Sequence, residues 1–476
     1  MKKQLATIFA LLAAVAAQAA AVIEQVIVRQ QWPWSTDVKI EYKLSGVTTP
    51  VDIAVTAYDG EAPLDSSRLA SALTGDRYGI TKNGVGTIIL DPVAAFGTAN
   101  VALADFSVKL SLSDSAANIN EVLYKIFDLT SGNCTDVTRK QLLNGEYGSV
   151  ETDFSKIGDG FNTTLDDVLI WTGVTNNIAY KTTHLVMRKI PAKDIVWRCG
   201  DGSDSTRERI ELQSQYYIKL REDFFIGVFE LTQAQYRNIQ GANPSTFSSA
   251  DDSPIRPVET VPYHMFPGSP TDPHGNPGRF ASDENVNWPT NTYLHDFGRD
   301  YVLDKFYLKT GWEFSLPTEA QWEFACRAGT TGPLYSGKLQ TVANAKELGW
   351  SSTTSGEETA THPVGLLKPN AFGLYDMLGN VCEHTHNATS GSMKSGAAAG
   401  SGDGLSAESP IIDPVGATAD APNRFRRGNS WNYESGSTLD SRSGTRLYFW
   451  TWYTGRSDQG FRLVCPVTSQ WAAHNL

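Results

Sequence analysis

The chain has 476 residues, of which 41% are hydrophobic and 19% are charged. At roughly 150 residues per domain, this length predicts two or three domains with packed cores and excludes a disordered polyelectrolyte. The formal net charge is −12, from 40 Lys and Arg against 52 Asp and Glu. No run of basic residues offsets this balance, so we expect no nucleic-acid partner.

The first residues have the pattern of a secretory signal. Lys2 and Lys3 precede an apolar stretch from Leu5 to Ala17, and Ala17-Gln18-Ala19 has the A-x-A form of a cleavage site. The apolar stretch is too short to span a bilayer, and such a leader is removed from the mature chain. We therefore expect residues 1–19 to be a signal peptide. The mature protein would then be secreted or periplasmic, without a membrane span.

Apolar and polar residues alternate in the region that follows. The alternation is clear in Val38–Leu44 and Phe106–Leu112 and weaker in Val51–Ala57. A period of two is typical of strands with one buried face, and several such segments between turn residues predict an antiparallel β-sandwich over residues 22–113. This region has no His and no Cys, so we interpret it as an accessory module, a spacer or docking domain. Residues 114–183 give mixed signals and are interpreted as a joining region.

A longer region rich in Gly and aromatic residues occupies 184–466. Thr232–Gln235 and Thr318–Gln321 fit the capping box that begins a helix. We expect the first helix to end at Gly241 and the second to bury Cys326 on its apolar face. By composition, two segments are predicted to be surface loops: Pro267–Trp288 and Asn387–Ser409.

Five blocks of this region resemble, in order, those of the formylglycine-generating enzyme (sulfatase-modifying factor) family. They are Phe225–Tyr236 (FIGVFELTQAQY), Leu316–Arg327 (LPTEAQWEFACR), Pro369–Val381 (PNAFGLYDMLGNV), Arg427–Trp431 (RGNSW) and Gly460–Val464 (GFRLV). The resemblance extends from Leu185 to Cys465. It implies an α+β fold of the C-type-lectin-like, formylglycine-generating-enzyme type for residues 184–466, preceded by the all-β sandwich.

The resemblance also says which catalytic groups to look for. Oxidases of the family use oxygen and copper to turn a substrate cysteine into formylglycine, and two thiolates after a G-G-S element hold the copper. Counted from Gly428-Asn429-Ser430, those positions are Tyr433 and Thr438. Hydroxyl groups cannot replace thiolates for Cu(I), so the resemblance implies the scaffold without copper or the oxidase activity. Ser430 is retained from the family's pocket, and we assign no catalytic residue.

Two metal sites are candidates in the segment Gly379–His386. Cys382, His384 and His386 stand where relatives have a W-E-W element, and in an extended segment they share a face, where they could bind Zn or Cu. The alternative, which we favour, is that they fill the space of two lost Trp rings. The resemblance further implies a structural calcium site at Gly379, Asn380, Val381 and Glu383, because calcium prefers oxygen ligands. Its alternative is an ordinary turn followed by a surface glutamate.

The resemblance also suggests a disulfide between Cys326 and Cys465, with two separate buried thiols as the alternative. The segment from Trp431 to Gly460 combines aromatic, small polar and Arg residues, which is typical of binding loops. In this fold family the region forms the ligand surface. The candidate residues are Trp431, Tyr433, Arg442, Arg446, Trp450 and Trp452. Alternatively, the rings pack in the core and the two arginines anchor loops through buried hydrogen bonds.

Three hypotheses for function follow. The leading one is an exported, non-catalytic protein that binds a peptide, a glycan or a protein partner. The second is an active sulfatase-modifying-factor-type or other metal-dependent enzyme that uses non-standard residues, for example Cys382, His384 and His386. The third is an envelope protein whose fold serves assembly. The first hypothesis fails if Cys382 or another thiol lies within bonding reach of Ser430.

Overall fold

The computed structural model describes residues 20–31, 35–97, 105–157, 163–200, 215–266, 301–351, 359–388, 397, 400–414, 424–432, 442–449 and 454–468. The predicted signal peptide therefore lies outside the described residues. The chain forms two compact units. The first is Met1–Glu121 with Arg139–Glu146, and the second is Val122–Thr138 with Tyr147–Leu476.

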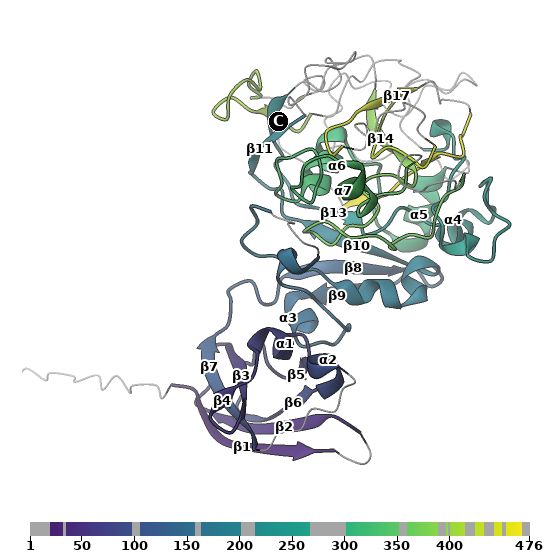
Figure 1. Ribbon diagram of the computed structural model, residues 1–476. Coiled ribbons are helices and arrows are strands. Elements are labelled where there is room, and N and C mark those ends of the chain that lie inside the picture. Colours follow the sequence, from purple (N-terminus) through teal and green to yellow (C-terminus); the bar gives the residue numbers. More distant parts are fainter. Residues whose placement is uncertain are drawn as a thin grey trace, which may run out of the picture. The chain divides into compact units, whose positions relative to one another are not determined.

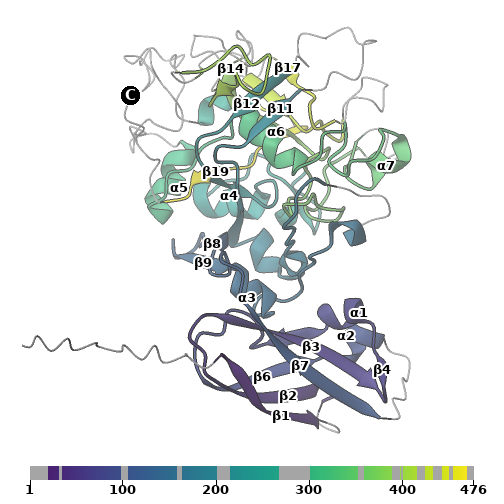
Figure 2. The same cartoon turned by 90° about the vertical axis from the view of Figure 1, so that its left-hand side faces the viewer.

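The first unit is built from two antiparallel sheets, as the alternating pattern predicts. One sheet has the order β1-β2-β6-β5 and the other β4-β3-β7 (Figures 1 and 2). The strands are β1 (Val22–Gln30), β2 (Val38–Ser45), β3 (Val51–Asp59), β4 (Ala62–Pro63), β5 (Leu73–Gly75), β6 (Gly84–Leu90) and β7 (Phe106–Asp114). Apolar residues of both sheets, such as Ile40, Ile53 and Ile88, are buried in one core. Short helices α1 (Ser66–Ala70), α2 (Pro92–Phe96) and α3 (Arg139–Leu143) complete the unit.

The second unit begins earlier than the sequence predicts. β8 (Val122–Asp128) and β9 (Cys134–Thr138) pair with each other, and β8 also pairs with β10 (His184–Ile190). These strands belong to a five-stranded sheet of order β19-β13-β10-β8-β9. The predicted boundary at residue 184 is therefore wrong. β8 is almost entirely buried, and a strand buried on both faces shows no polar alternation from which to recognise it.

The rest of the second unit is mixed helix and sheet, which confirms the α+β class. Its further strands are β11 (Val196–Cys199), β12 (Tyr216–Lys219), β13 (Phe224–Gly227), β14 (Cys382–Ala388), β15 (Ile411–Ile412), β16 (Arg424–Arg427), β17 (Leu447–Phe449), β18 (Gln459–Gly460) and β19 (Val464–Pro466). They form the five-stranded sheet, a sheet β11-β12-β15 and a sheet β17-β16-β14-β18. The helices are α4 (Gln233–Gln240), α5 (Val302–Thr310), α6 (Glu319–Arg327) and α7 (Val342–Lys346). Among the described helices, none is long and apolar enough to cross a membrane.

Both predicted capping boxes are present. The Thr232 hydroxyl accepts from the Gln235 backbone and the Gln235 side chain accepts from the Thr232 backbone, so α4 begins there, and it ends at Gly241 in the left-handed conformation. α6 begins with the same exchange at Thr318, and Cys326 is fully buried on it. Each box satisfies two amide groups that the first turn leaves without partners. The predicted loop Pro267–Trp288 lies outside the described residues, as does much of Asn387–Ser409.

Candidate functional site

The sheet β17-β16-β14-β18 brings the residues around Ser430 together. In its register Cys382 lies opposite Gln459, and His384 lies opposite Arg426. Opposed residues of paired strands project to the same face of a sheet, so these four side chains share one face. With Ser430, whose hydroxyl lies beside Cys382, we call them the Ser430 site. All five residues are buried.

A tight turn after β16 sets the position of Ser430. Gly428 and Asn429 have φ angles of 90° and 66°, and these positive values suit glycine and are tolerated by asparagine. Asn429 therefore preserves a backbone conformation that a second glycine would also adopt. Its Oδ1 accepts from the Ser430 backbone at 2.8 Å. The Trp431 amide donates to the Asn380 carbonyl at 2.9 Å, which ties the turn to the segment before β14.

The thiol beside Ser430 is that of Cys382. Burial raises the pKa of this thiol to about 11, although the Arg426 charge and the Ser430 hydroxyl act in the opposite direction. The thiol is therefore protonated at neutral pH. Both side-chain amide atoms of Gln459 are buried and have no hydrogen-bond partner among the residues that the structure describes. Buried polar atoms normally have a partner, so the Ser430 site has unused hydrogen-bonding capacity.

The Cys382, His384 and His386 triplet does not form a metal centre in the described part of the chain, where no three Cys, His, Asp or Glu side chains are placed to hold one ion. The His384 ring packs against Tyr263 and Phe266, and its Nε2 lies 3.2 Å from the Val261 carbonyl. Burial and nearby arginines lower the pKa of both histidines to about 3. His384 thus occupies an aromatic wall, in line with the alternative favoured from the sequence.

The opposite face of β14 carries a buried ion pair. Arg462 Nε lies 2.8 and 2.7 Å from the two carboxylate oxygens of Glu383, and Trp322 Nε1 donates to Glu383 Oε2 at 2.7 Å. Arg462 also donates to the carbonyls of Gly227 and Tyr375, each at 3.0 Å. Removing one partner of such a buried pair typically costs about 3–5 kcal/mol, because the other charge is left unpaired.

These contacts do not fit the predicted calcium site. The Glu383 carboxylate is already neutralised by Arg462, and the Asn380 carbonyl accepts from Trp431. The Asn380 side chain and the Val381 amide donate instead to Glu230, at 2.7 and 3.1 Å. Glu383 is fully buried, so the alternative of a surface glutamate is also wrong.

Two further carboxylates near this pair were not predicted. Burial, with the charges of Asp376 and Glu383, raises the pKa of Glu230 well above its usual value. Burial also raises the pKa of Asp376 to about 6, against the hydrogen bond from Gly365 and the charges of Arg462 and Lys181. Asp376 Oδ2 accepts from the Gly365 amide at 2.7 Å. Its Oδ1 is buried and has no hydrogen-bond partner among the described residues.

A second buried network holds the segment that follows β16. Glu319 on α6 accepts from Arg446 at 2.5 and 2.6 Å and from Arg427 at 3.1 Å. Glu323, one turn along, accepts from Arg327 at 2.8 Å and from Arg427 at 3.0 Å. All five side chains are buried. Arg446 is therefore a structural anchor, and its assignment to a ligand surface is wrong.

The other candidate ligand-surface residues divide into two groups. Trp431 and Arg442 are also buried, and the Trp431 indole donates to the Ser457 carbonyl at 3.1 Å and packs edge-on against Phe247. Their side chains do not form an exposed surface. The other three candidates lie outside the described part of the chain: Tyr433, Trp450 and Trp452.

The predicted disulfide between Cys326 and Cys465 is absent. All five cysteines are free thiols. Cys326 packs in the core cluster of Trp322 and Met377, whereas Cys465 lies in the separate cluster of Phe225 and Phe461. The Cys465 thiol is 3.6 Å from the Met187 sulfur. The sequence alternative of two separate buried thiols is the one observed.

Sequence reasoning missed the residues that carry the buried charges. Glu230, Glu319, Glu323 and Arg462 each lie in one of the five recognised blocks, among apolar or aromatic neighbours. A charged residue inside an otherwise buried block indicates a buried pair, because an unpaired charge there is too costly. This signal was present in the sequence, but it does not tell which charges pair.

Comparisons with known proteins agree with the blocks. Residues 198–467 match the model of the family described as sulfatase-modifying factor enzyme 1-like domain. A chaperone protein LppX of Paenibacillus barcinonensis is 28% identical over 208 residues, which are 35% of this chain and 65% of that protein. The formylglycine-generating enzyme of Mus musculus is 40% identical over 78 residues, 15% of this chain and 21% of that enzyme. The inactive C-alpha-formylglycine-generating enzyme 2 of Bos taurus is 37% identical over 76 residues, 15% of this chain and 25% of that protein.

The raised pKa of Asp376 gives a prediction for stability. A carboxyl group whose pKa rises on folding contributes stability below its unfolded value, and this contribution is lost as the pH rises through the folded value. We expect the unfolding free energy of the wild type, relative to Asp376→Asn, to fall by roughly 3 kcal/mol between about pH 3 and pH 7. Denaturant unfolding at each pH measures this difference. Asp251→Asn, at an exposed position, controls for the loss of one charge, and a difference independent of pH would contradict the prediction.

Proposed function

Since this chain belongs to the sulfatase-modifying factor family, we propose that it is an exported member that lacks the oxidase activity and binds a peptide, a glycan or a protein partner. The observation that carries the proposal is that this chain has no cysteine at the two positions where the family's oxidases bind copper. Tyr433 and Thr438 stand there, and neither can supply the thiolate that Cu(I) requires.

The thiol of Cys382 beside Ser430 is the observation that counts against a non-catalytic role, and the protonation of the described thiols is the argument that keeps the proposal. Cys382 is a single thiol beside Ser430, and its pKa of about 11 keeps it protonated. Burial also raises the pKa of Cys199 and Cys326 to about 12. A protonated thiol is a poor nucleophile and a poor metal ligand. Matches to an inactive formylglycine-generating enzyme and to a chaperone are consistent with this role.

Binding is supported by the buried contacts that fix the described parts of the segment from Trp431 to Gly460; we call these contacts its frame. Its described parts are fixed by buried contacts, from Trp431 to Asn380, from Arg446 to Glu319 and from Trp431 to Ser457. The sequence between them is rich in Tyr, Trp, Ser, Gly and Thr. Rigid aromatic rings and short polar side chains on a fixed frame are typical of binding loops. Export is proposed because residues 1–19 have the composition of a secretory signal.

The absence of oxidase activity can be tested directly. The mature chain, supplied with copper and oxygen, is incubated with a Cys-x-Pro-x-Arg peptide, and we expect mass spectrometry to find the cysteine unmodified. A double variant, Tyr433→Cys with Thr438→Cys, serves as the matched control and is expected to bind Cu(I) where the wild type does not. Conversion of the peptide to formylglycine by the wild type would overturn the proposal.

One observation favours the second hypothesis, an enzyme that uses other residues. Cys382 lies beside Ser430, where a thiol could act as a catalytic group or a metal ligand. If a metal uses this thiol, the purified mature chain will contain Cu or Zn in stoichiometric amount, and Cys382→Ser will lose it. Under the leading proposal we expect no stoichiometric metal in either protein. Cys199→Ser, which replaces another buried thiol, is the control for general destabilisation.

Ligand binding can be assigned to the segment by substitution. We expect the wild-type chain to bind members of a glycan or peptide array, and Trp450→Ala with Trp452→Ala to lose at least about tenfold in affinity, as is typical when aromatic anchors are truncated. Leu308→Ala, at an exposed apolar residue of α5, should bind like the wild type. Equal binding by all three proteins would show that the aromatic residues of this segment do not contact the ligand.

A further inference from the structure

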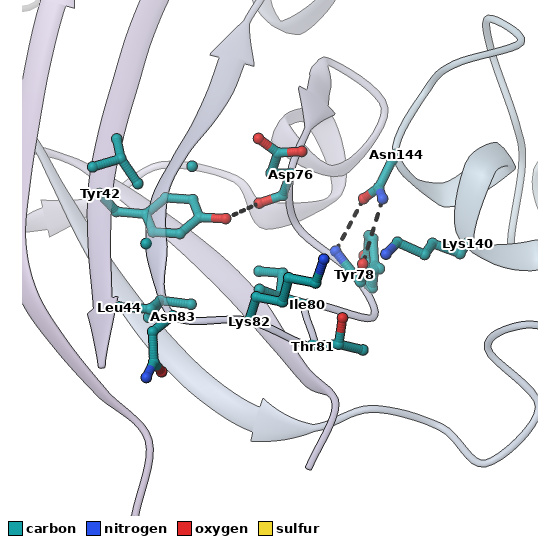
Figure 3. A pocket seen from close by; sticks show the side chains of 13 residues that line it. Tyr42, Leu44, Asp76, Tyr78, Ile80, Thr81, Lys82, Asn83, Lys140 and Asn144 are labelled. Atoms are coloured by element: carbon teal, nitrogen blue, oxygen red, sulfur yellow. Dashed lines mark hydrogen bonds between the residues drawn. The ribbon is translucent and has the colours of Figure 1, made fainter. Parts of the chain in front are cut away.

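The first unit, which the sequence suggested was only a spacer or docking module, contains a pocket (Figure 3). Its volume is about 350 Å³, and residues of β2, of the segment between β5 and β6, and of α3 with the loop after it line it. This volume is within the range of small-molecule sites, roughly 300–1,000 Å³. All the lining residues belong to the first unit.

Hydrogen bonds between its own walls hold the pocket in shape. Asn144 Oδ1 accepts from the backbone of Arg77 at 3.1 Å and of Tyr78 at 2.9 Å. Lys140 Nζ donates to the Gly79 carbonyl at 2.8 Å. The loop between β5 and β6 is thus attached to α3 by side chains at two points. A pre-formed pocket loses less entropy on binding than one that must be ordered.

The buried ring of Tyr42 packs over a strand glycine at one wall. A Cβ at Gly86 would come within 2.1 Å of the Tyr42 hydroxyl oxygen, so this ring position requires glycine there. The hydroxyl donates to the Asp76 carbonyl at 2.7 Å (Figure 3). The ring is therefore fixed between the two strands, and it gives the pocket a rigid apolar surface.

The polar groups that remain are mainly hydrogen-bond donors. Lys82 is exposed, and its ammonium group forms no ion pair with any residue that the structure describes. Lys140 uses one of its three N–H groups on Gly79. Asn83 Oδ1 accepts from the Val47 amide at 2.8 Å, which leaves its NH₂ group to donate. The pocket also contains one acidic group, the carboxylate of Asp76, whose Oδ2 accepts from the Thr87 backbone amide at 3.1 Å.

Two ammonium groups with one carboxylate give the lining a positive charge within a chain of net charge −12. Groups that donate hydrogen bonds and carry positive charge match the oxygen atoms of an anion, and charge-assisted hydrogen bonds of this kind are the stronger ones. We propose that this pocket binds an oxyanion, a carboxylate, sulfate or phosphate group, carried by a small ligand. The Lys82 and Lys140 ammonium groups and the Asn83 amide would contact the oxyanion, and the Tyr42 wall would contact the remainder of the ligand.

The test is calorimetry on the mature full-length chain with three classes of probe. Inorganic phosphate and sulfate probe the anion alone, glucuronate probes an acidic sugar, and glucose serves as the neutral control. We expect saturable binding of at least one anionic probe that weakens as the salt concentration rises, and no binding of glucose. Glucuronate binding tighter than that of phosphate and sulfate would identify the ligand as an organic acid, and the reverse order would identify it as a free inorganic anion.

Variants connect the binding to the pocket. Lys82→Gln and Lys140→Gln should each lower the affinity for the anion by about five- to tenfold. Asp76→Asn should raise this affinity, because it removes a charge that repels the anion. Lys109→Gln, an exposed lysine of β7 in the other sheet, should bind like the wild type. Thermal unfolding checks that each variant is folded. The proposal is overturned if no anion binds, if glucose binds equally well, or if Lys109→Gln has the effect of Lys82→Gln. Each of these results would leave the proposed function of the second unit unaffected.

Discussion

The ion pair between Glu383 and Arg462 is the contact on which the second unit depends. Glu383 belongs to β14, and Arg462 lies between β18 and β19 and reaches the carbonyls of the segments around Gly227 and Tyr375. The Trp322 indole of α6 donates to the same carboxylate. This buried pair therefore joins the helix α6, the strands β14 and β13, and the two loops that contain Tyr375 and Arg462. A fold with so much irregular backbone needs such directional contacts, because apolar packing alone is non-directional.

The same principle explains how much of the molecule could be predicted from its sequence. The strands of the first unit followed from alternation, and α4 and α6 followed from their capping boxes, since both signals are local. β8 was missed because burial on both faces removes the alternation. The disulfide and the calcium site were both implied by resemblance. The disulfide is absent, and the carboxylate of the predicted calcium site is instead paired with Arg462. The residues next to Cys326 and Glu383 do not indicate which residues these two contact. Those contacts are made with segments more than seventy residues away in the chain.

The Ser430 site shows the same limit. The sequence identified Ser430 and the loss of thiols at the two family positions, but it could not place Cys382 beside the hydroxyl. That contact arises because β14 pairs with β16 on one side and with β18 on the other. The outcome is a buried cluster of a thiol, a serine hydroxyl and an amide, in which burial keeps the thiol protonated. The proposed function thus keeps the scaffold and dispenses with the reactive groups, which is the ordinary way in which one fold serves different functions.

The free thiols affect how long the chain remains in its native state. Four of the five cysteines are buried, and packing rather than covalent pairing keeps them from reacting. Heat or denaturant would expose these thiols, and where dissolved oxygen or another oxidant is present the unfolded chain would be oxidised to disulfides that the native state lacks. Under the proposed export to an oxidising compartment, the persistence of the folded chain is set by how slowly it unfolds, and we expect refolding in the laboratory to require a reductant.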